Sequence, residues 1–327
     1  MNKIKFGTDG WRAIIAEDFT VQNVARVAEA SAIWLKQRSE SPSAVVGHDC
    51  RFAGRLFAET VAKVLTSNGV KVMMADGFVS TPMISLGAVK HGTDLGIILT
   101  ASHNPPSYNG FKLKGSFGGP LSPADVQSIE DLIPVSPNTD YAKVDLAEME
   151  RSGLLAKVNL EDEYISHVEN NFDLEAIRNS GMNLVYDAMY GAGQNVMKRL
   201  FPDFKLLHCD HNPGFNGQAP EPIHKNLKEL HALMSGGGYD CALVTDGDAD
   251  RIGMYDGQGD FVDSHHIILL LIHYLYKYKG MRGKVCTAFS TTPKVEKLCN
   301  HYGLEIQTVK IGFKYICEIM LKDDVLL

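Results

Sequence analysis

A loop with three aspartates at alternate positions is the clearest candidate for chemistry in this chain. The sequence there reads DGDADR over residues 246–251 and directly follows the apolar, strand-like run CALV. Carboxylates that converge from one loop supply the hard oxygen ligands of Mg²⁺, which keeps other positions for water or a phosphate oxygen. Open α/β sheets place ligands at the carboxyl ends of strands. We therefore predict a metal site at Asp246, Asp248 and Asp250.

Two other interpretations of this loop compete with a metal site. A solvated acidic loop is the common explanation for a run of charge, but it gives no reason for three acids at the end of a buried strand. A calcium EF-hand requires Gly at loop position six and Glu at position twelve. Those positions hold Arg251 and Gly257, so the EF-hand is rejected.

A serine followed by a histidine forms the second candidate, in TASHNPPSYNG at residues 100–110. The loop follows an apolar run, and its prolines suggest a fixed turn that displays the hydroxyl of Ser102. A serine is a poor nucleophile unless a base or a metal assists it. His103 or Lys112, which lies beyond an expected Asn109-Gly110 turn, could move a proton or steady phosphate charge. A Ser-His pair alone is ordinary turn chemistry, but together with the aspartate loop it favours covalent catalysis.

A glycine-rich segment near the N-terminus, FGTDGWR at residues 6–12, is the third candidate. Backbone amides beside the guanidinium of Arg12 can cradle a phosphate. Alone the signal is weak, since a turn before a helix starting near Thr20 would look similar. The segments at 48–51 (HDCR) and 191–193 (GAG) are assigned no chemistry.

The elements that must position these residues follow one repeated pattern. A short apolar run, a small-residue loop, a helical stretch and a second apolar run recur around residues 44–74, 183–207 and 284–306. This is the signature of βαβ units in mostly parallel sheets. We predict an α/β protein with serial, topologically similar three-layer domains and mixed, mostly parallel sheets.

The chain of 327 residues exceeds the size at which one hydrophobic core stops growing, so several domains are expected. We place them at residues 1–155, with the serine loop, 156–256, with the metal loop, and 257–327. Residues 160–172 and 265–278 are expected to be helical, the latter buried, and 256–260 a hairpin or interdomain turn. The third unit stops after one helix and an apolar run, and we expect it to be incomplete.

Composition excludes several classes of partner. The formal net charge is −7, so the average surface would repel nucleic acid and anionic membranes. The longest apolar stretch, residues 267–275, is too short for a span of about 20 residues. The N-terminus has no apolar signal region. Six scattered cysteines without a CxxC pair fit reduced thiols in the cytoplasm.

Taken together and in order, FGTDGWR, TASHNPxxxNGFK and DGDADR resemble the α-D-phosphohexomutase superfamily, within its phosphoglucomutase/phosphomannomutase group. The resemblance runs through the whole chain. Its lesser echoes are a turn at Thr81-Pro82, the segment Pro220-Glu221-Pro222 and residues 312–315 (GFKY). Members of that superfamily have four domains, the first three alike. The sugar-reading loop late in the third domain, and the fourth domain, have no counterpart in these residues.

The resemblance implies a mutase that exchanges hexose 1-phosphate and hexose 6-phosphate of glucose or mannose through a hexose 1,6-bisphosphate. Phosphoserine forms at the serine, Mg²⁺ is held by the aspartates with that phosphate, and arginines neutralise phosphoryl charge. The implied set is Ser102, Asp246, Asp248 and Asp250 at the metal, Arg12 and Arg251 on phosphate, and His103 and Lys112 as proton-transfer candidates, with Lys112 also on phosphate.

Two alternatives remain open from sequence. The first is a phosphoglucosamine mutase, a neighbouring enzyme of the same superfamily. The second is a truncated, non-catalytic protein that binds sugar phosphates. An intact nucleophile and an intact aspartate triad argue against a pure binder, which needs no serine to carry phosphate. A chain without the substrate-gripping domain would be an impaired mutase.

Overall fold

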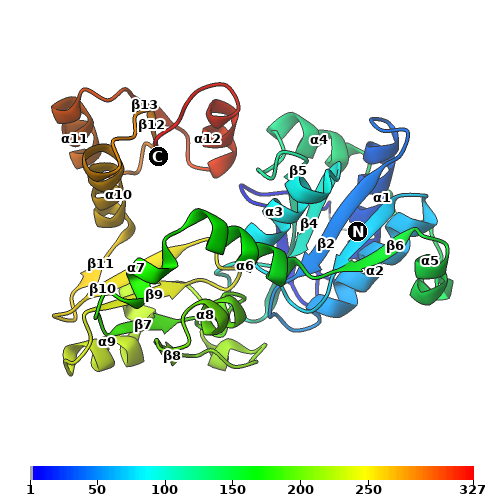
Figure 1. Ribbon diagram of the computed structural model, residues 1–327. Helices are drawn as coiled ribbons and strands as arrows, with labels where there is room; N and C mark the ends of the chain where they lie inside the picture. The colour runs from blue at the N-terminus through cyan, green and yellow to red at the C-terminus, as the bar shows by residue number, and fades with distance from the viewer. Residues whose placement is uncertain (1–2) are drawn as a thin grey trace. The chain divides into compact units, whose positions relative to one another are not determined.

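The computed structural model describes residues 3–327 and divides into two compact units, one ending at Asp260 and the other spanning Phe261–Leu327. Within the first unit lie two mixed β-sheets with helices packed on them, and within the second a two-stranded parallel sheet (Figure 1). No helix in the described part of the chain is long and apolar enough to cross a membrane. The α/β fold class predicted from the repeated apolar runs is confirmed.

The first sheet has the strand order β1-β5-β4-β2-β3-β6. Its strands are β1 (Trp11–Ile14), β2 (Ser43–His48), β3 (Lys71–Ala75), β4 (Leu95–Leu99), β5 (Tyr108–Gly115) and β6 (Leu155–Val158). β2, β3, β4 and β6 are parallel, while β5 runs antiparallel to both β4 and β1. The sheet continues to Val158, beyond the expected boundary at residue 155; the three domain boundaries stay predictions.

Helices cover both faces of this sheet. They are α1 (Val21–Lys36), α2 (Gly54–Ser67), α3 (Thr81–His91), α4 (Pro123–Asp131), α5 (Leu146–Arg151) and α6 (Leu160–Asn171), with a 3₁₀ turn η1 (Tyr141–Lys143). Alternate residues of β2 separate the faces, because successive strand side chains point to opposite sides. Ala44 and Val46 pack with α1 and α2, whereas Val45 packs with α3 and α6.

The second sheet supplies the predicted aspartate loop. Its strands in this unit run in the order β10-β9-β7-β8. They are β7 (Leu184–Asp187), β8 (Lys205–Leu207), β9 (Cys241–Thr245) and β10 (Ile252–Asp256), accompanied by α7 (Leu174–Arg178), α8 (Gln194–Leu200), α9 (Lys228–Ser235), η2 (Phe215–Gly217) and η3 (His224–Asn226). β7, β8 and β9 are parallel, as the βαβ pattern predicted. A bond from the Asp256 amide to the Asp260 carbonyl closes the expected turn after β10.

The second unit contains β11 (Phe261–Val262), α10 (Ser264–His273), a π-helical turn η4 (Tyr274–Tyr278), β12 (Val285–Ala288), α11 (Lys294–Tyr302), β13 (Ile306–Val309) and α12 (Phe313–Met320). β12 and β13 pair in parallel, so the third predicted βαβ unit is confirmed. The helix predicted at 265–278 is present, with its last turn π-helical, but its predicted burial is wrong. Leu270, Leu271 and Tyr274 are exposed, and Ile272 is the buried residue of α10.

Two expected turns are regular structure instead. Asn109-Gly110 lies within β5, because both residues pair with β1 and the Gly110 carbonyl accepts the Thr100 amide, which outweighs the turn tendency of that dipeptide. A side chain at Gly110 would lie 2.3 Å from the Thr100 carbonyl oxygen, so glycine there serves close strand approach. Thr81-Pro82 begins α3, with Ser80 as its N-cap, since proline fits the first turn of a helix.

Candidate active site

The predicted serine lies in the short loop that follows β4. β4 ends at Leu99, and Ser102 adopts a left-handed φ of 52°, which is uncommon for a residue with a side chain. Its side chain is fully buried, so the hydroxyl does not face solvent. The Ser102 hydroxyl instead donates to Asp246 Oδ2 at 2.7 Å. The serine loop and the aspartate loop therefore share one site, as the sequence predicted.

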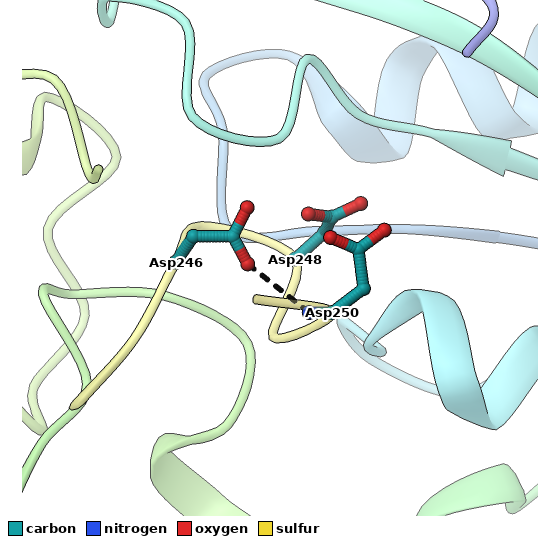
Figure 2. Close-up of side chains that lie close together, drawn as sticks. All are labelled: Asp246, Asp248 and Asp250. Carbon is teal, nitrogen blue, oxygen red and sulfur yellow. Dashed lines mark hydrogen bonds between the residues drawn. The ribbon is translucent and has the colours of Figure 1, made fainter. Parts of the chain in front are cut away.

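The aspartate loop follows β9 and returns into β10. Figure 2 shows Asp246, Asp248 and Asp250 projecting to the same side of the loop. One carboxylate oxygen from each lies within 4.8 Å of the others. Asp246 Oδ1 accepts the Asp250 amide at 3.0 Å and the Arg251 amide at 3.1 Å, which fixes the loop's curvature. Burial and the neighbouring acids raise the pKa of Asp246 well above its usual range.

Lys112 reaches this cluster from the middle of β5. Its ammonium lies 2.7 Å from Asp248 Oδ2, 3.0 Å from Asp250 Oδ2 and 2.7 Å from Asp9 Oδ2, and the side chain is almost fully buried. Burial alone would lower the pKa of this lysine, but the three carboxylates raise it above its ordinary value. In the same way, burial works against the charged Asp248, yet the ammonium holds that pKa below its usual range.

The residues present fit a divalent cation. Three converging carboxylates are the hard oxygen set that Mg²⁺ takes. Asp248 Oδ1 is buried without a hydrogen-bond partner among the described residues, and such an orphaned acceptor costs free energy unless something binds it. Asp248 is further held by Thr81 of α3, whose amide donates to the Asp248 carbonyl at 3.0 Å and whose hydroxyl donates to its carboxylate.

Arg12 and Asp9 bring the N-terminal segment to the same place. A tight turn from Gly7 to Gly10 precedes β1, which pairs with β5. Arg12 donates to Asn104 Oδ1 in the serine loop at 2.9 Å and lies 3.2 Å from Asp9 Oδ2. The guanidinium is thus beside the serine loop.

The two remaining predicted residues lie at the edge of the cluster. His103 Nδ1 is 3.4 Å from the Ser102 hydroxyl oxygen. Burial, together with the charges of Arg251 and Arg12, lowers the pKa of His103 to about 4, so the imidazole is neutral at physiological pH. Arg251 is exposed. Every residue predicted for the site is therefore on or beside these two loops.

Sequence reasoning missed the residues beneath the serine loop. Arg51 and Asp49 belong to the segment after β2 that was assigned no chemistry, yet both are buried against this loop. Arg51 donates hydrogen bonds to serine-loop carbonyls, and Asp49 accepts the Thr100 hydroxyl. A usable signal existed, because β2 is parallel to β4 and carboxyl ends of parallel strands meet at one edge.

The contacts of Gly191 explain why the other segment that was assigned no chemistry, residues 191–193, is rich in glycine. A side chain on it would lie 2.6 Å from the carbonyl oxygen of Asp246, and the next residue, Ala192, donates its amide to the Gly247 carbonyl. The glycine-rich stretch after β7 thus packs directly against the backbone of the aspartate loop. Its role is to let two backbones approach closely.

Serial α/β units that bring a buried serine, a lysine and an aspartate triad together define a scaffold for phosphoryl transfer. Family models agree over nearly the whole chain: phosphoglucomutase/phosphomannomutase α/β/α domain I matches residues 3–138, domain II residues 162–259 and domain III residues 263–327. The chain belongs to the phosphoglucomutase/phosphomannomutase family of the α-D-phosphohexomutase superfamily. The resemblance found in the sequence is confirmed.

Proteins similar to this chain are named as mutases of different sugar phosphates. A phosphoglucosamine mutase from Caldicellulosiruptor bescii is 28% identical, over 97% of this chain and 70% of the relative. A phosphoglucomutase/phosphomannomutase from Thermococcus kodakarensis is also 28% identical, over 98% of this chain and 69% of the relative. A crystal structure from Thermus thermophilus, assigned as a phosphomannomutase, is 32% identical with a TM-score of 0.90, covering 99% of this chain and 73% of that one.

Proposed function

We propose that this chain is a phosphohexomutase that interconverts hexose 1-phosphate and hexose 6-phosphate, with glucose or mannose as the sugar. The observation that carries the proposal is the 2.7 Å hydrogen bond between the hydroxyl of Ser102 and the carboxylate of Asp246, with both residues fully buried. Covalent catalysis through a serine divides one difficult transfer into two easier ones. A serine held against a carboxylate cluster is suited to that use.

In the proposed reaction, phosphate on Ser102 moves to the free hydroxyl of a bound hexose monophosphate. The bond between phosphorus and the serine oxygen breaks, and a bond between phosphorus and the sugar oxygen forms. The proton of the sugar hydroxyl passes to His103, which gives a proton to the departing serine oxygen. The 1,6-bisphosphate then turns around, and its other phosphate returns to Ser102 by the reverse steps.

We assign the proton transfer to His103 rather than to Lys112 on geometry. The imidazole Nδ1 lies 3.4 Å from the serine oxygen, whereas the Lys112 ammonium is engaged by three carboxylates. Lys112 then serves as a fixed positive charge beside the phosphoryl group. Arg12 and Arg251 add charge at the edge of the site and would bind phosphate oxygens, as guanidinium groups do well.

Mg²⁺ is the cofactor we propose, with Asp246, Asp248, Asp250 and the phosphate on Ser102 as its ligands. When bound, the ion stabilises negative charge on the transferring phosphoryl group. The chain's own contribution is position and exclusion of water, since positioning and electrostatics dominate this chemistry. The full burial of Ser102 keeps bulk water from the phosphoserine.

Phosphorylation of the protein tests the proposal. The purified chain is incubated with glucose 1,6-bisphosphate and Mg²⁺, and its intact mass is measured. We expect the wild type to gain the mass of one phosphate and Ser102→Ala to gain none. Ser107→Ala is the matched control, because Ser107 is exposed in the same loop and should not affect the gain. A wild type that gains no phosphate would contradict the proposal and favour a non-catalytic sugar-phosphate-binding protein.

A phosphoglucosamine mutase is the second candidate, and the relative from Caldicellulosiruptor bescii that carries that name is the observation in its favour. Mutase rates with glucose 1-phosphate, mannose 1-phosphate and glucosamine 1-phosphate, each compared at limiting substrate, separate the two. A preference for the amino sugar would overturn the glucose or mannose assignment.

We also propose that the enzyme is cytoplasmic, which is supported by its free cysteine thiols.

A further inference from the structure

Arg51 is a buried cation whose guanidinium donates hydrogen bonds to backbone carbonyls of the serine loop. It follows β2, and its side chain is fully buried. One terminal nitrogen, Nη2, donates to the carbonyls of Ser102 and Asn104, both at 2.6 Å. The other, Nη1, donates to the carbonyls of Pro105 at 2.8 Å and Tyr108 at 3.0 Å. Four carbonyls spread over the whole loop therefore converge on one guanidinium.

The segment after β2 also helps to hold the backbone amide of Ser102, through Asp49 and Thr100. The Thr100 hydroxyl accepts a hydrogen bond from the Ser102 amide at 2.9 Å and donates its proton to Asp49 Oδ2. Asp49 Oδ2 also lies 3.4 Å from Arg51 Nε. The same carboxylate therefore contacts both the Thr100 hydroxyl and the Arg51 guanidinium. The peptide groups on either side of Ser102 are thus fixed by residues from the end of β2.

Such fixing is needed because Ser102 is strained. Its φ of 52° places a residue with a side chain in the left-handed region, which is unfavourable for residues other than glycine because Cβ approaches the following carbonyl oxygen. A relaxed loop would rotate the backbone at this residue and carry the hydroxyl away from Asp246. Strain of this kind persists only where the surroundings over-determine it.

We infer that Arg51 is a positioning residue that holds the loop in the conformation aiming the Ser102 hydroxyl at the aspartate cluster. Arginine suits the role because its planar fork carries four terminal N–H donors, whereas lysine has three donors on a single atom. The Phe215 ring, 5.0 Å from the guanidinium carbon, closes the opposite side. A lysine could not reach all four carbonyls from that position.

The inference rests on the proposed function, so its test starts from phosphorylation of Ser102 by glucose 1,6-bisphosphate. The single-turnover rate and the half-saturating bisphosphate concentration are measured for wild type, Arg51→Lys and Arg51→Ala. We expect the saturated rate of Arg51→Lys to fall about 100-fold, as for a misplacement near 1 Å. The half-saturating concentration and the Mg²⁺ affinity by calorimetry should stay within about twofold, since one residue only orients another.

Chemical rescue adds a readout that a loss of folding would not give. Millimolar guanidinium chloride should restore part of the rate of Arg51→Ala, and sodium chloride at equal ionic strength should not. Should Arg51→Ala fail to fold, Arg51→Lys decides, with its folded fraction fixed by thermal melting. Arg55→Lys is the matched control, because Arg55 lies on α2 with its side chain 80% exposed, and its rate should equal wild type.

The possible outcomes are separable. A wild type that is never phosphorylated refutes the proposed function itself. A phosphorylated wild type with an Arg51→Lys rate that falls only in proportion to its folded fraction, or with a rise in half-saturation and no loss of saturated rate, overturns the positioning role. A lower saturated rate in a folded protein, with unchanged half-saturation, supports it.

Discussion

Gly247 lies between two of the proposed metal ligands and faces the serine loop, so replacing it with alanine tests how closely the two loops must meet. A Cβ at this position would lie 2.5 Å from the carbonyl oxygen of Ser102 and 3.0 Å from Pro220 Cγ. The first of these atoms belongs to backbone and cannot swing aside. The substitution should therefore push the aspartate loop and the serine loop apart.

The expected magnitude follows from that contact. Carbon–oxygen contacts without a bond relax to about 3.3 Å, so the loops should separate by roughly 0.8 Å. Misplacing reacting groups by about 1 Å costs on the order of 100-fold in rate, so we expect a fall of tens-fold. Overpacking of a well-packed site also costs about 1–3 kcal/mol of stability. Gly247→Ala should thus remain folded but transfer phosphate slowly.

The assay is single-turnover phosphorylation of Ser102 by glucose 1,6-bisphosphate, followed by intact mass, with thermal melting in parallel. Gly236→Ala is the control. Gly236 ends α9 with a φ of −72°, and a Cβ there would make only ordinary contacts at 3.4 Å. Its rate should match wild type. If Gly247→Ala reacts at the wild-type rate, the 2.5 Å approach does not govern the chemistry and the reasoning fails.

Two further predictions concern metal and pH. Asp246→Asn should melt close to wild type in the presence of EDTA, because an amide can keep the bonds to the amides of Asp250 and Arg251. It should lose the rise in melting temperature that Mg²⁺ gives wild type, where a ligand at 100 times its Kd adds about 2.7 kcal/mol; an undiminished rise would remove Asp246 from the metal site. His208 hydrogen-bonds Asp187 at 2.9 Å, and this bond raises the pKa of His208. The contribution of His208 to stability is therefore complete below its unfolded pKa of about 6.5 and is lost as pH rises through its folded pKa. His208→Asn, which keeps a residue tolerant of φ 47°, should lose less stability than wild type between pH 6.5 and 8 in melting curves, and an equal loss in both would exclude this histidine.

The sequence predicted the parts of the fold that depend on local pattern. The three βαβ units and the Thr20 start of α1 follow from alternation, periodicity and capping, and each is present. Two of the failures depend on tertiary structure. Asn109-Gly110 has the composition of a turn, but pairing with β1 and a hydrogen bond from the Thr100 amide to the Gly110 carbonyl hold it extended. α10 is rich in leucine and isoleucine, yet composition cannot say which face is covered.

The candidate site divides in the same way. Ser102 and the aspartates were predicted, because their residue types already specify chemistry. Arg51, Asp49 and Thr81 were missed, because nothing in their types suggests a role until the carboxyl ends of β2, β4 and β9 and the start of α3 are brought together. Their function is to orient other groups, and orientation is a property of distances that a linear sequence does not contain.

The place of β5 inside the first sheet has one more consequence. β5 carries Lys112 and is bonded on both edges, to β4, which leads to Ser102, and to β1, which carries Arg12. A slip of one residue in either ladder would turn the lysine to the opposite face. Arg12 and Lys112 therefore lie on two adjacent strands, and Ser102 lies in the loop that follows the third. We expect these three strands to fold and to unfold as one cooperative unit.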